Sequence, residues 1–188
     1  HVRAWPASLY SSSKVATAVA RAAAATPGGV RAAPVLMEAL ALLHCHSGHH
    51  QAALELFLQL APQHADVFAF VERHHLHGFL RPHVRLLASH GWPKALSLLL
   101  RCTEALPPPE VVRQLEPHGA DEGEAPLRRL HEYLHGLFQQ DLHVSAAFHT
   151  RQLALYARFA PELLLPFLIG SPHYNLDAAL EVCRRHRL

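Results

Sequence analysis

The sequence predicts an all-α fold, an α-solenoid of stacked antiparallel helix hairpins. Ala and Leu dominate a chain that is 50% hydrophobic, and a scarcity of β-branched residues favours helix over strand. Apolar residues recur at three- and four-residue steps in most segments, which is the period of an amphipathic helix. A short phrase also returns at a spacing near 40 residues. Such a spacing in a helical chain is typical of repeats built from helix pairs.

The repeated phrase is Ala-Leu after a turn. It occurs at Leu54, Leu96 and Leu180, which lie 42 and then 84 residues apart, and 84 is twice 42. The missing member falls at Phe138, where no Ala-Leu pair stands. We expect the small Ala to let two helices approach closely and the Leu to fill the layer between hairpins.

Residues 127–168 contain the clearest hairpin. Two apolar stripes of helical spacing flank a break at residues 141–144, and each predicted helix is about 15 residues long. The first stripe comprises Leu127, Leu130, Tyr133, Leu134, Leu137 and Phe138. The second comprises Phe148, Gln152, Leu155, Tyr156 and Phe159, with Gln152 as the one polar member. The aromatic residues Tyr133, Phe138, Phe148, Tyr156, Phe159 and Phe167 are therefore predicted to be core.

Pro and Gly residues separate the helices expected before this hairpin. These helices span residues 11–25 with serines at the cap, 34–47, 51–60, 65–74, 80–89 and 93–102. Pro34 and Pro82 suit first turns, and Gly48 and Gly91 suit C-terminal caps. We expect residues 1–33 to form a lead-in with the first helix and residues 34–188 to form the solenoid.

The second half contains a proline run and a polar segment. Pro107, Pro108 and Pro109 are expected to break the chain sharply, leaving a short helix over residues 110–115. Residues 116–125 hold four acids and two glycines, and we interpret this acidic loop as a solvated connector. Helices over residues 162–169 and 176–185 close the chain.

Composition excludes several classes of function. The 17 basic and 15 acidic residues nearly balance, whereas a nucleic-acid-binding domain carries a basic face. The one basic cluster, Arg184, Arg185 and Arg187, is interpreted as a helix C-terminus. No apolar run approaches the length needed to cross a bilayer. Three widely spaced cysteines form no disulfide framework, which favours a reducing compartment.

Two groups of residues carry candidate chemistry. His44, Cys45, His46, His49 and His50 are possible zinc or copper ligands. The 18 histidines are spread along the chain, so surface histidines are the preferred interpretation and no metal is assigned.

Ser145 and His149 share a helix face with Asp141 one turn earlier, as in a catalytic triad. Asp141 is better interpreted as a helix end and Ser145 as a cap. No glycine-rich phosphate loop occurs, because Gly28-Gly29 lacks the Lys that would follow. We predict no enzyme activity, catalytic residue or cofactor.

Several phrases resemble one family in order and spacing. They are Trp5-Pro6 with Leu9-Tyr10-Ser11, Ala65-Asp66-Val67-Phe68 with His74 and Leu76, Tyr133 to Asp141, Phe148-His149, Gln152 to Ala157, Leu164 to Leu168, and Tyr174 to Cys183. On these phrases nearly all 188 residues resemble the clathrin-heavy-chain-repeat region of the vacuolar protein sorting-associated protein 41 family. The proline run and the acidic loop depart from its pattern, as do histidines and alanines at many surface positions.

The resemblance implies a scaffold segment of a HOPS tethering-complex subunit. Such a subunit is cytoplasmic and peripheral on late endosome, vacuole or lysosome membranes, and it acts through contacts with other tethering-complex subunits. The family's β-propeller and RING-type zinc domain do not occur in this sequence. Because the chain begins at His1, we expect it to be a fragment.

Two alternatives stay open. One is another clathrin- or tetratricopeptide-like coat or adaptor scaffold, since Ser47-Gly48 before Ala52-Ala53-Leu54 is a tetratricopeptide-like phrase. The other is a His-rich metal-binding helical protein.

Overall fold

The computed structural model describes residues 11–25, 34–60, 65–119, 122–140, 146–171 and 173–186. Within these ranges the chain is helical and contains no strand, so the predicted all-α fold is confirmed. No helix in these ranges has the length and apolar character needed to cross a bilayer. Two compact units, His1–Ala95 and Leu96–Leu188, divide the chain. The sequence analysis expected a boundary between a lead-in and the solenoid after residue 33. Residues 26–33 lie outside the described part of the chain, so this boundary stays a prediction.

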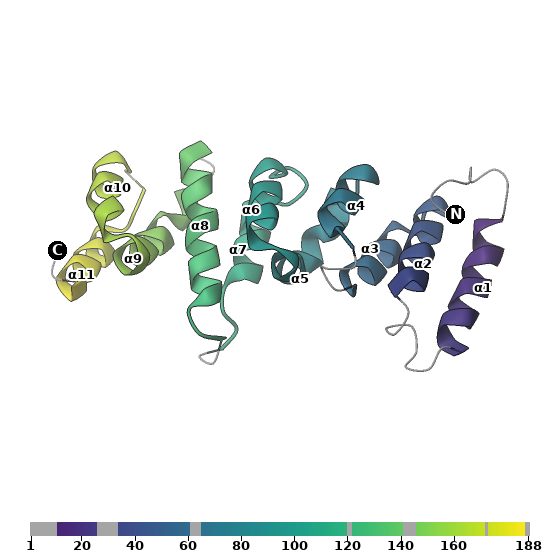
Figure 1. Cartoon of the computed structure of the whole chain (residues 1–188). Coiled ribbons are helices and arrows are strands. Elements are labelled where there is room, and N and C mark those ends of the chain that lie inside the picture. Colours follow the sequence, from purple (N-terminus) through teal and green to yellow (C-terminus); the bar gives the residue numbers. More distant parts are fainter. Residues whose placement is uncertain are drawn as a thin grey trace. The chain divides into compact units, whose positions relative to one another are not determined.

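The first unit is a succession of short helices (Figure 1). They are α1 (Ser12–Ala25), α2 (Pro34–His46), α3 (His50–Leu58), α4 (Val67–Arg73), the 3-10 helix η3 (His77–His83), α5 (Val84–His90), and the start of α6 (Trp92–Arg101). α2 packs against both α1 and α3, and α3 also contacts α4 and η3. Each helix therefore packs mainly against its neighbours in sequence.

The second unit continues α6 and contains the predicted hairpin. Its further helices are α7 (Pro108–Leu115), α8 (Ala125–Gln140), η5 (Ala146–Phe148), α9 (His149–Phe159), η6 (Pro161–Leu163), α10 (Leu164–Gly170) and α11 (Leu176–His186). α8 packs against α7 and α9, and α9 packs against α10 and α11. The helix-hairpin packing predicted for an α-solenoid is present within each unit.

The turn between α2 and α3 is built as the sequence predicts. Gly48 adopts a positive φ of 77°, a conformation that costs glycine little. The His49 N–H donates to the His44 carbonyl at 2.9 Å, and the Gly48 N–H donates to the Cys45 carbonyl at 3.0 Å. This pair of bonds is the Schellman motif, which satisfies carbonyls that the helix end leaves unpaired.

Most members of the predicted apolar stripes are buried in the hairpin of α8 and α9, whereas Leu127 at the start of the α8 stripe is half-buried. Leu130, Tyr133, Leu134, Leu137 and Phe138 are buried on α8, and Gln152, Leu155 and Tyr156 are buried on α9. Phe167 on α10 is also buried, whereas Phe148 and Phe159 are half-buried at the two ends of the α9 stripe. The core assignment is therefore confirmed for four of the six aromatic residues and partly met for the other two.

The repeated Ala-Leu phrase occupies equivalent places in three helices. Leu54, Leu96 and Leu180 are each the fifth residue of α3, α6 and α11, whereas Phe138 lies near the end of α8. The preceding alanines, Ala53, Ala95 and Ala179, are all buried. The expectation that Leu fills a layer is wrong at Leu180, which is 47% exposed because no described element covers that face of α11.

Two predictions about proline are wrong. Pro82 was expected in the first turn of an α-helix, but it lies inside η3, and α5 begins only at Val84. The run at residues 107–109 was expected to precede the next helix, yet Pro107 is the N-cap of α7 and Pro108 is its first residue. A first-turn proline loses nothing there, because that N–H has no partner within the helix.

Candidate functional site

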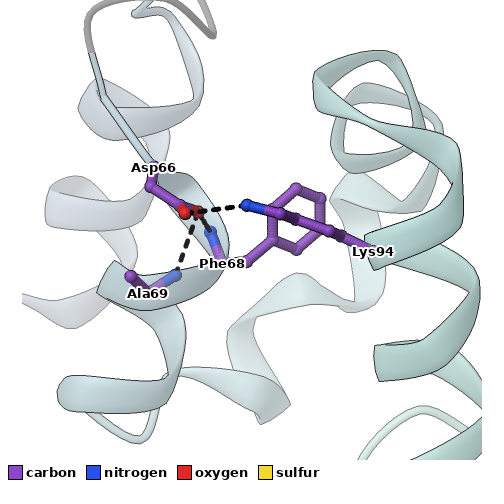
Figure 2. Close-up of polar contacts among 4 residues, drawn as sticks. All are labelled: Asp66, Phe68, Ala69 and Lys94. Atoms are coloured by element: carbon purple, nitrogen blue, oxygen red, sulfur yellow. Dashed lines mark hydrogen bonds and ion pairs between the residues drawn. The ribbon is translucent and has the colours of Figure 1, made fainter.

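The start of α4 is joined to α6 by a carboxylate. Asp66 is the N-cap residue of α4, and its Oδ1 accepts hydrogen bonds from the Phe68 N–H at 3.0 Å and the Ala69 N–H at 3.2 Å. Lys94 Nζ on α6 lies 2.9 Å from Asp66 Oδ2 (Figure 2). The Lys94 ammonium also lies 5.7 Å from the centre of the Phe68 ring, within the range of a cation–π contact.

These contacts define the electrostatics of the cleft around Asp66. The hydrogen bond from Lys94 and the backbone bond from Ala69 lower the pKa of the Asp66 carboxyl below its usual value. The cleft has a volume of about 430 Å³ and is lined by Asp66 and its neighbours and by residues from His90 to Lys94. Both carboxylate oxygens are already bonded, so this arrangement ties two helices together and offers no free base.

A polar cluster lies in the otherwise apolar contact between α8 and α9. His131 and His135 are one turn apart on α8, and Gln152 and Tyr156 are one turn apart on α9. Gln152 Nε2 lies 3.2 Å from His131 Nδ1, and His135 Nδ1 lies 2.7 Å from the Tyr156 hydroxyl. Gln152 is 0% exposed. These are the cross-helix hydrogen bonds that buried polar groups require.

Burial sets the protonation of this cluster. It lowers the pKa of His131, with the nearby His135 as the next cause. Burial also raises the pKa of the Tyr156 phenol, partly offset by a hydrogen bond from Gln152. Burial therefore favours the neutral forms of the His131 imidazole and the Tyr156 phenol.

Of the three residues compared with a catalytic triad, the structure describes His149. Asp141 and Ser145 lie outside the described residues. His149 is 0% exposed, and its Nδ1 forms a hydrogen bond with the hydroxyl of Ser171, which is 4% exposed. The His149 ring also packs edge-on against Phe138, at 4.7 Å between ring centres. His149 and Ser171 thus join α9 to the segment after α10, inside the core.

A pocket of about 260 Å³ is lined by residues of α8, α9 and α10 and by Ser171. Its walls are mostly apolar and include Phe138, Tyr156 and Phe167, with His135 and Ser171 among the polar residues.

The histidine-rich segment lies at the junction of α2 and α3. Cys45 is 8% exposed, and burial raises the pKa of its thiol to about 11, so the thiolate that binds metals is scarce at neutral pH. The His44 and His49 rings meet edge-on at 5.8 Å, and burial followed by the charge of His49 lowers the pKa of His44. Across the described ranges no three His, Cys, Asp or Glu side chains are grouped closely enough to hold a metal ion.

The acidic segment of residues 116–125 forms ion pairs with two arginines of α9. Glu116 Oε1 lies 3.0 Å from Arg151 Nε, and Glu124 Oε1 lies 2.5 Å from Arg158 Nη2. The two ends of the acidic segment are therefore tied to α9, a contact that the sequence did not reveal.

The basic cluster lies at the end of α11, as expected. Arg184 and Arg185 are in its last turn, and Arg185 pairs with Glu181 at 2.5 Å. Arg187 lies outside the described residues.

The sequence comparisons agree along the whole chain. The family model described as the Vps41 TPR-like region matches residues 1–188. The chain is 36% identical over 183 residues to a vacuolar protein sorting-associated protein 41 homolog of Solanum lycopersicum. It is 33% identical over 184 residues to the homologs of Danio rerio and Homo sapiens.

The chain belongs to the vacuolar protein sorting-associated protein 41 family. It spans about a fifth of the length of these relatives: the matches cover 97–98% of this chain but 18% of the tomato protein and 20% of the other two. No solved structure matches the chain.

The phrases that resemble the vacuolar protein sorting-associated protein 41 family build the packing of the second unit. The phrase from Tyr133 contributes the buried face of α8, and the phrase from Gln152 contributes the buried face of α9. The phrases from Leu164 and Tyr174 form most of α10 and α11.

Asp66 is the helix-joining position that sequence reasoning used only as part of a family phrase. The sequence did contain the pattern that predicts this cap, because Asp directly before an apolar helical run is a typical N-cap. Its bond to Lys94, 28 residues away, had no sequence signal.

Proposed function

We propose that this chain is a scaffold segment of a HOPS-like tethering subunit that acts in protein transport and membrane fusion at the vacuole or lysosome. The family match over residues 1–188 carries the proposal. The packing described above supports it, because the buried residues of α2, α3, α8 and α9 are used to join helices. Helical repeats of this kind present long surfaces to protein partners.

The proposed mechanism is mechanical. Each helix is held to its neighbours by an apolar stripe, and polar bonds such as Asp66–Lys94 and Glu124–Arg158 fix pairs of elements. A segment built in this way separates the flanking domains of a longer protein and offers its outer faces to other tethering-complex subunits. Membrane association is then peripheral and indirect, through the assembled complex, on the cytoplasmic side of late endosomes and vacuoles.

A catalytic function has little physical support. The described histidine that bonds a serine hydroxyl in the core, His149, is buried together with Ser171. A nucleophile and its base must reach a substrate. We propose a protein without enzyme activity, cofactor or nucleic-acid partner.

A cell-based replacement experiment tests the proposal. Cells that lack their own family member receive the full-length protein with the native segment, with Leu155→Asp, or with the matched control Ala154→Asp. Leu155 is 3% exposed, whereas its neighbour Ala154 is exposed, so only the first change places a charge in the core. We expect the native protein and the control to restore vacuolar cargo sorting and to co-purify with tethering subunits.

The same experiment separates the alternatives. Co-purification with coat or adaptor subunits, and not with tethering subunits, would support the other scaffold class. Restored sorting by the Leu155→Asp protein would show that the folded segment is dispensable and would contradict the proposal.

A further inference from the structure

The polar cluster between α8 and α9 has an unusual composition for a helix contact. Two histidines from α8 meet a glutamine and a tyrosine from α9, and Tyr156 lies between the two imidazoles. Its ring centre is 5.4 Å from that of His131 and 5.8 Å from that of His135, and both contacts are edge-on. Histidine is the residue type in this cluster whose ordinary pKa lies nearest neutral pH.

The hydrogen bond that Gln152 donates requires neutral His131. The Gln152 Nε2 amide can only donate, so the His131 Nδ1 that it meets at 3.2 Å accepts the bond and carries no proton. Protonation of His131 places a proton on Nδ1. Two donors, Nδ1 and Gln152 Nε2, then face each other, and the hydrogen bond is lost. The bond can then re-form only if the Gln152 amide rotates and presents Oε1, which is buried and has no hydrogen-bond partner among the described residues.

The charges that surround His131 act in both directions on its protonation. The titratable and charged groups that face it are Arg128, Glu132 and His135 from α8, Tyr156 from α9, and Glu162 from η6. His135 and Arg128 oppose protonation, while Glu132 and Glu162 favour it. Two imidazolium ions one helical turn apart repel each other, and their partial burial strengthens the repulsion.

We propose that the α8–α9 contact is proton-sensitive: it is held by neutral His131 and loosens when that imidazole is protonated. The lowered pKa of His131 agrees with the geometry, since folding favours the neutral ring. When the pKa of a histidine is lower in the folded state than in the unfolded state, the free energy of unfolding decreases as the pH falls below the unfolded-state pKa. Acidification therefore weakens this contact between helices.

Hydrogen exchange measured by mass spectrometry tests the proposal on the full chain. Exchange of peptides covering α9 is compared at about pH 7.5 and about pH 5.5, after correction for the intrinsic pH dependence of exchange. Three proteins are compared: the native chain, His131→Gln/His135→Gln, and the control His118→Gln/His186→Gln, whose histidines are exposed. Peptides covering α2 and α3 serve as an internal reference.

We expect α9 of the native chain and of the control to lose protection at the lower pH relative to the reference. The His131→Gln/His135→Gln protein should keep its α9 protection nearly constant. An equal loss of α9 protection in all three proteins would overturn the proposal, and so would no loss in the native chain.

A second measurement needs no substitution at the cluster, in case that variant folds poorly. The imidazole carbon resonances of the native chain are followed by NMR through a pH titration, with the exposed His118 as the reference. His131 should titrate at lower pH than His118, with a line-shape change in α9 amides as His131 becomes charged. Titration of His131 at or above the pH of His118 would overturn the proposal.

Discussion

Gly136 of α8 lies directly against Leu100 of α6. A Cβ built on Gly136 would be 2.5 Å from Leu100 Cδ1 and 3.1 Å from Leu100 Cδ2. These distances leave no room for a methyl group unless the leucine side chain moves. The two helices therefore approach as closely here as a glycine permits.

The first prediction concerns this contact. Gly136→Ala should destabilise the native chain by about 1 kcal/mol, because overpacking outweighs the better helix propensity of alanine. In a Leu100→Ala background the clash is absent, and the same change should stabilise by up to about 1 kcal/mol. Urea unfolding of the four proteins measures both effects. Equal effects in the two backgrounds would show that the leucine side chain moves without cost.

The second prediction concerns the apolar contact between α8 and α9. Leu137→Asp should unfold the second unit, because Leu137 is 2% exposed and a buried unpaired carboxylate costs several kcal/mol. Gln139→Asp is the matched control, since Gln139 is exposed on the same helix. Circular dichroism melting curves check both. A native-like melting curve for Leu137→Asp would rule out the packing described for α8.

The third prediction concerns the cap of α4. Asp66→Ala should cost about 1 kcal/mol through the lost cap, whereas Asp66→Asn should cost less because asparagine also caps helices. Lys94→Met should cost well under about 1 kcal/mol, because Lys94 is 64% and Asp66 47% exposed and solvent screens the pair. Chemical denaturation at neutral pH ranks the three changes. A larger loss from Lys94→Met than from Asp66→Ala would reverse the proposed order.

The stability of the chain at low pH should also depend on the Asp66 carboxylate. The pKa of Asp66 is lower in the folded chain than in the unfolded chain, so its contribution is present above the unfolded pKa and is lost as pH falls through the folded one. Below about pH 4 the native chain should therefore lose stability more steeply than Asp66→Asn. Parallel acid-unfolding curves for the two proteins would contradict this.

The fourth prediction concerns Tyr133. Its side chain is 0% exposed, burial raises the pKa of its phenol, and none of the described residues hydrogen-bonds its hydroxyl. Tyr133→Phe should stabilise the chain by about 1 kcal/mol, because it removes a buried polar group without a partner. Tyr156→Phe is the contrasting variant and should destabilise, since the Tyr156 hydroxyl bonds His135. The midpoint of thermal unfolding distinguishes the two.

The fifth prediction concerns thiol reactivity. Cys45 is buried with a pKa raised to about 11, whereas Cys102 and Cys183 are half-buried. Thiolate is the reactive form, so a disulfide reagent at neutral pH should modify Cys45 much more slowly than the other two. Mass spectrometry of partly labelled protein gives the order directly. Rapid labelling of Cys45 in the folded chain would show that the junction of α2 and α3 opens readily.

Local pattern predicted the helices well. The stripes of α8 and α9 follow from side-chain spacing alone, and Gly48 ends α2 because only the nearby backbone determines that turn. Features that depend on distant residues were missed. Lys94 reaches Asp66 across 28 residues, and Arg158 reaches Glu124 across 34. Sequence spacing carries no information about such pairs.

The errors at proline and at Leu180 have separate causes. Pro108 begins α7, whereas Pro82 lies inside the 3-10 helix η3, and the sequence could not distinguish a 3-10 turn from an α-helical first turn. Leu180 matches the repeat phrase, but its burial depends on a neighbouring helix that no described residue supplies. The repeat predicted the position of the residue in its helix and not its exposure.

The three-residue turn at residues 47–49 has a consequence for how the chain acquires its structure. Closing so short a loop loses little chain entropy, so α2 and α3 can pair as soon as both have been synthesised. Contacts between sequence neighbours give a low contact order, which is associated with fast folding. We therefore expect hairpins to form one after another as the nascent chain leaves the ribosome, before the remainder of the protein exists.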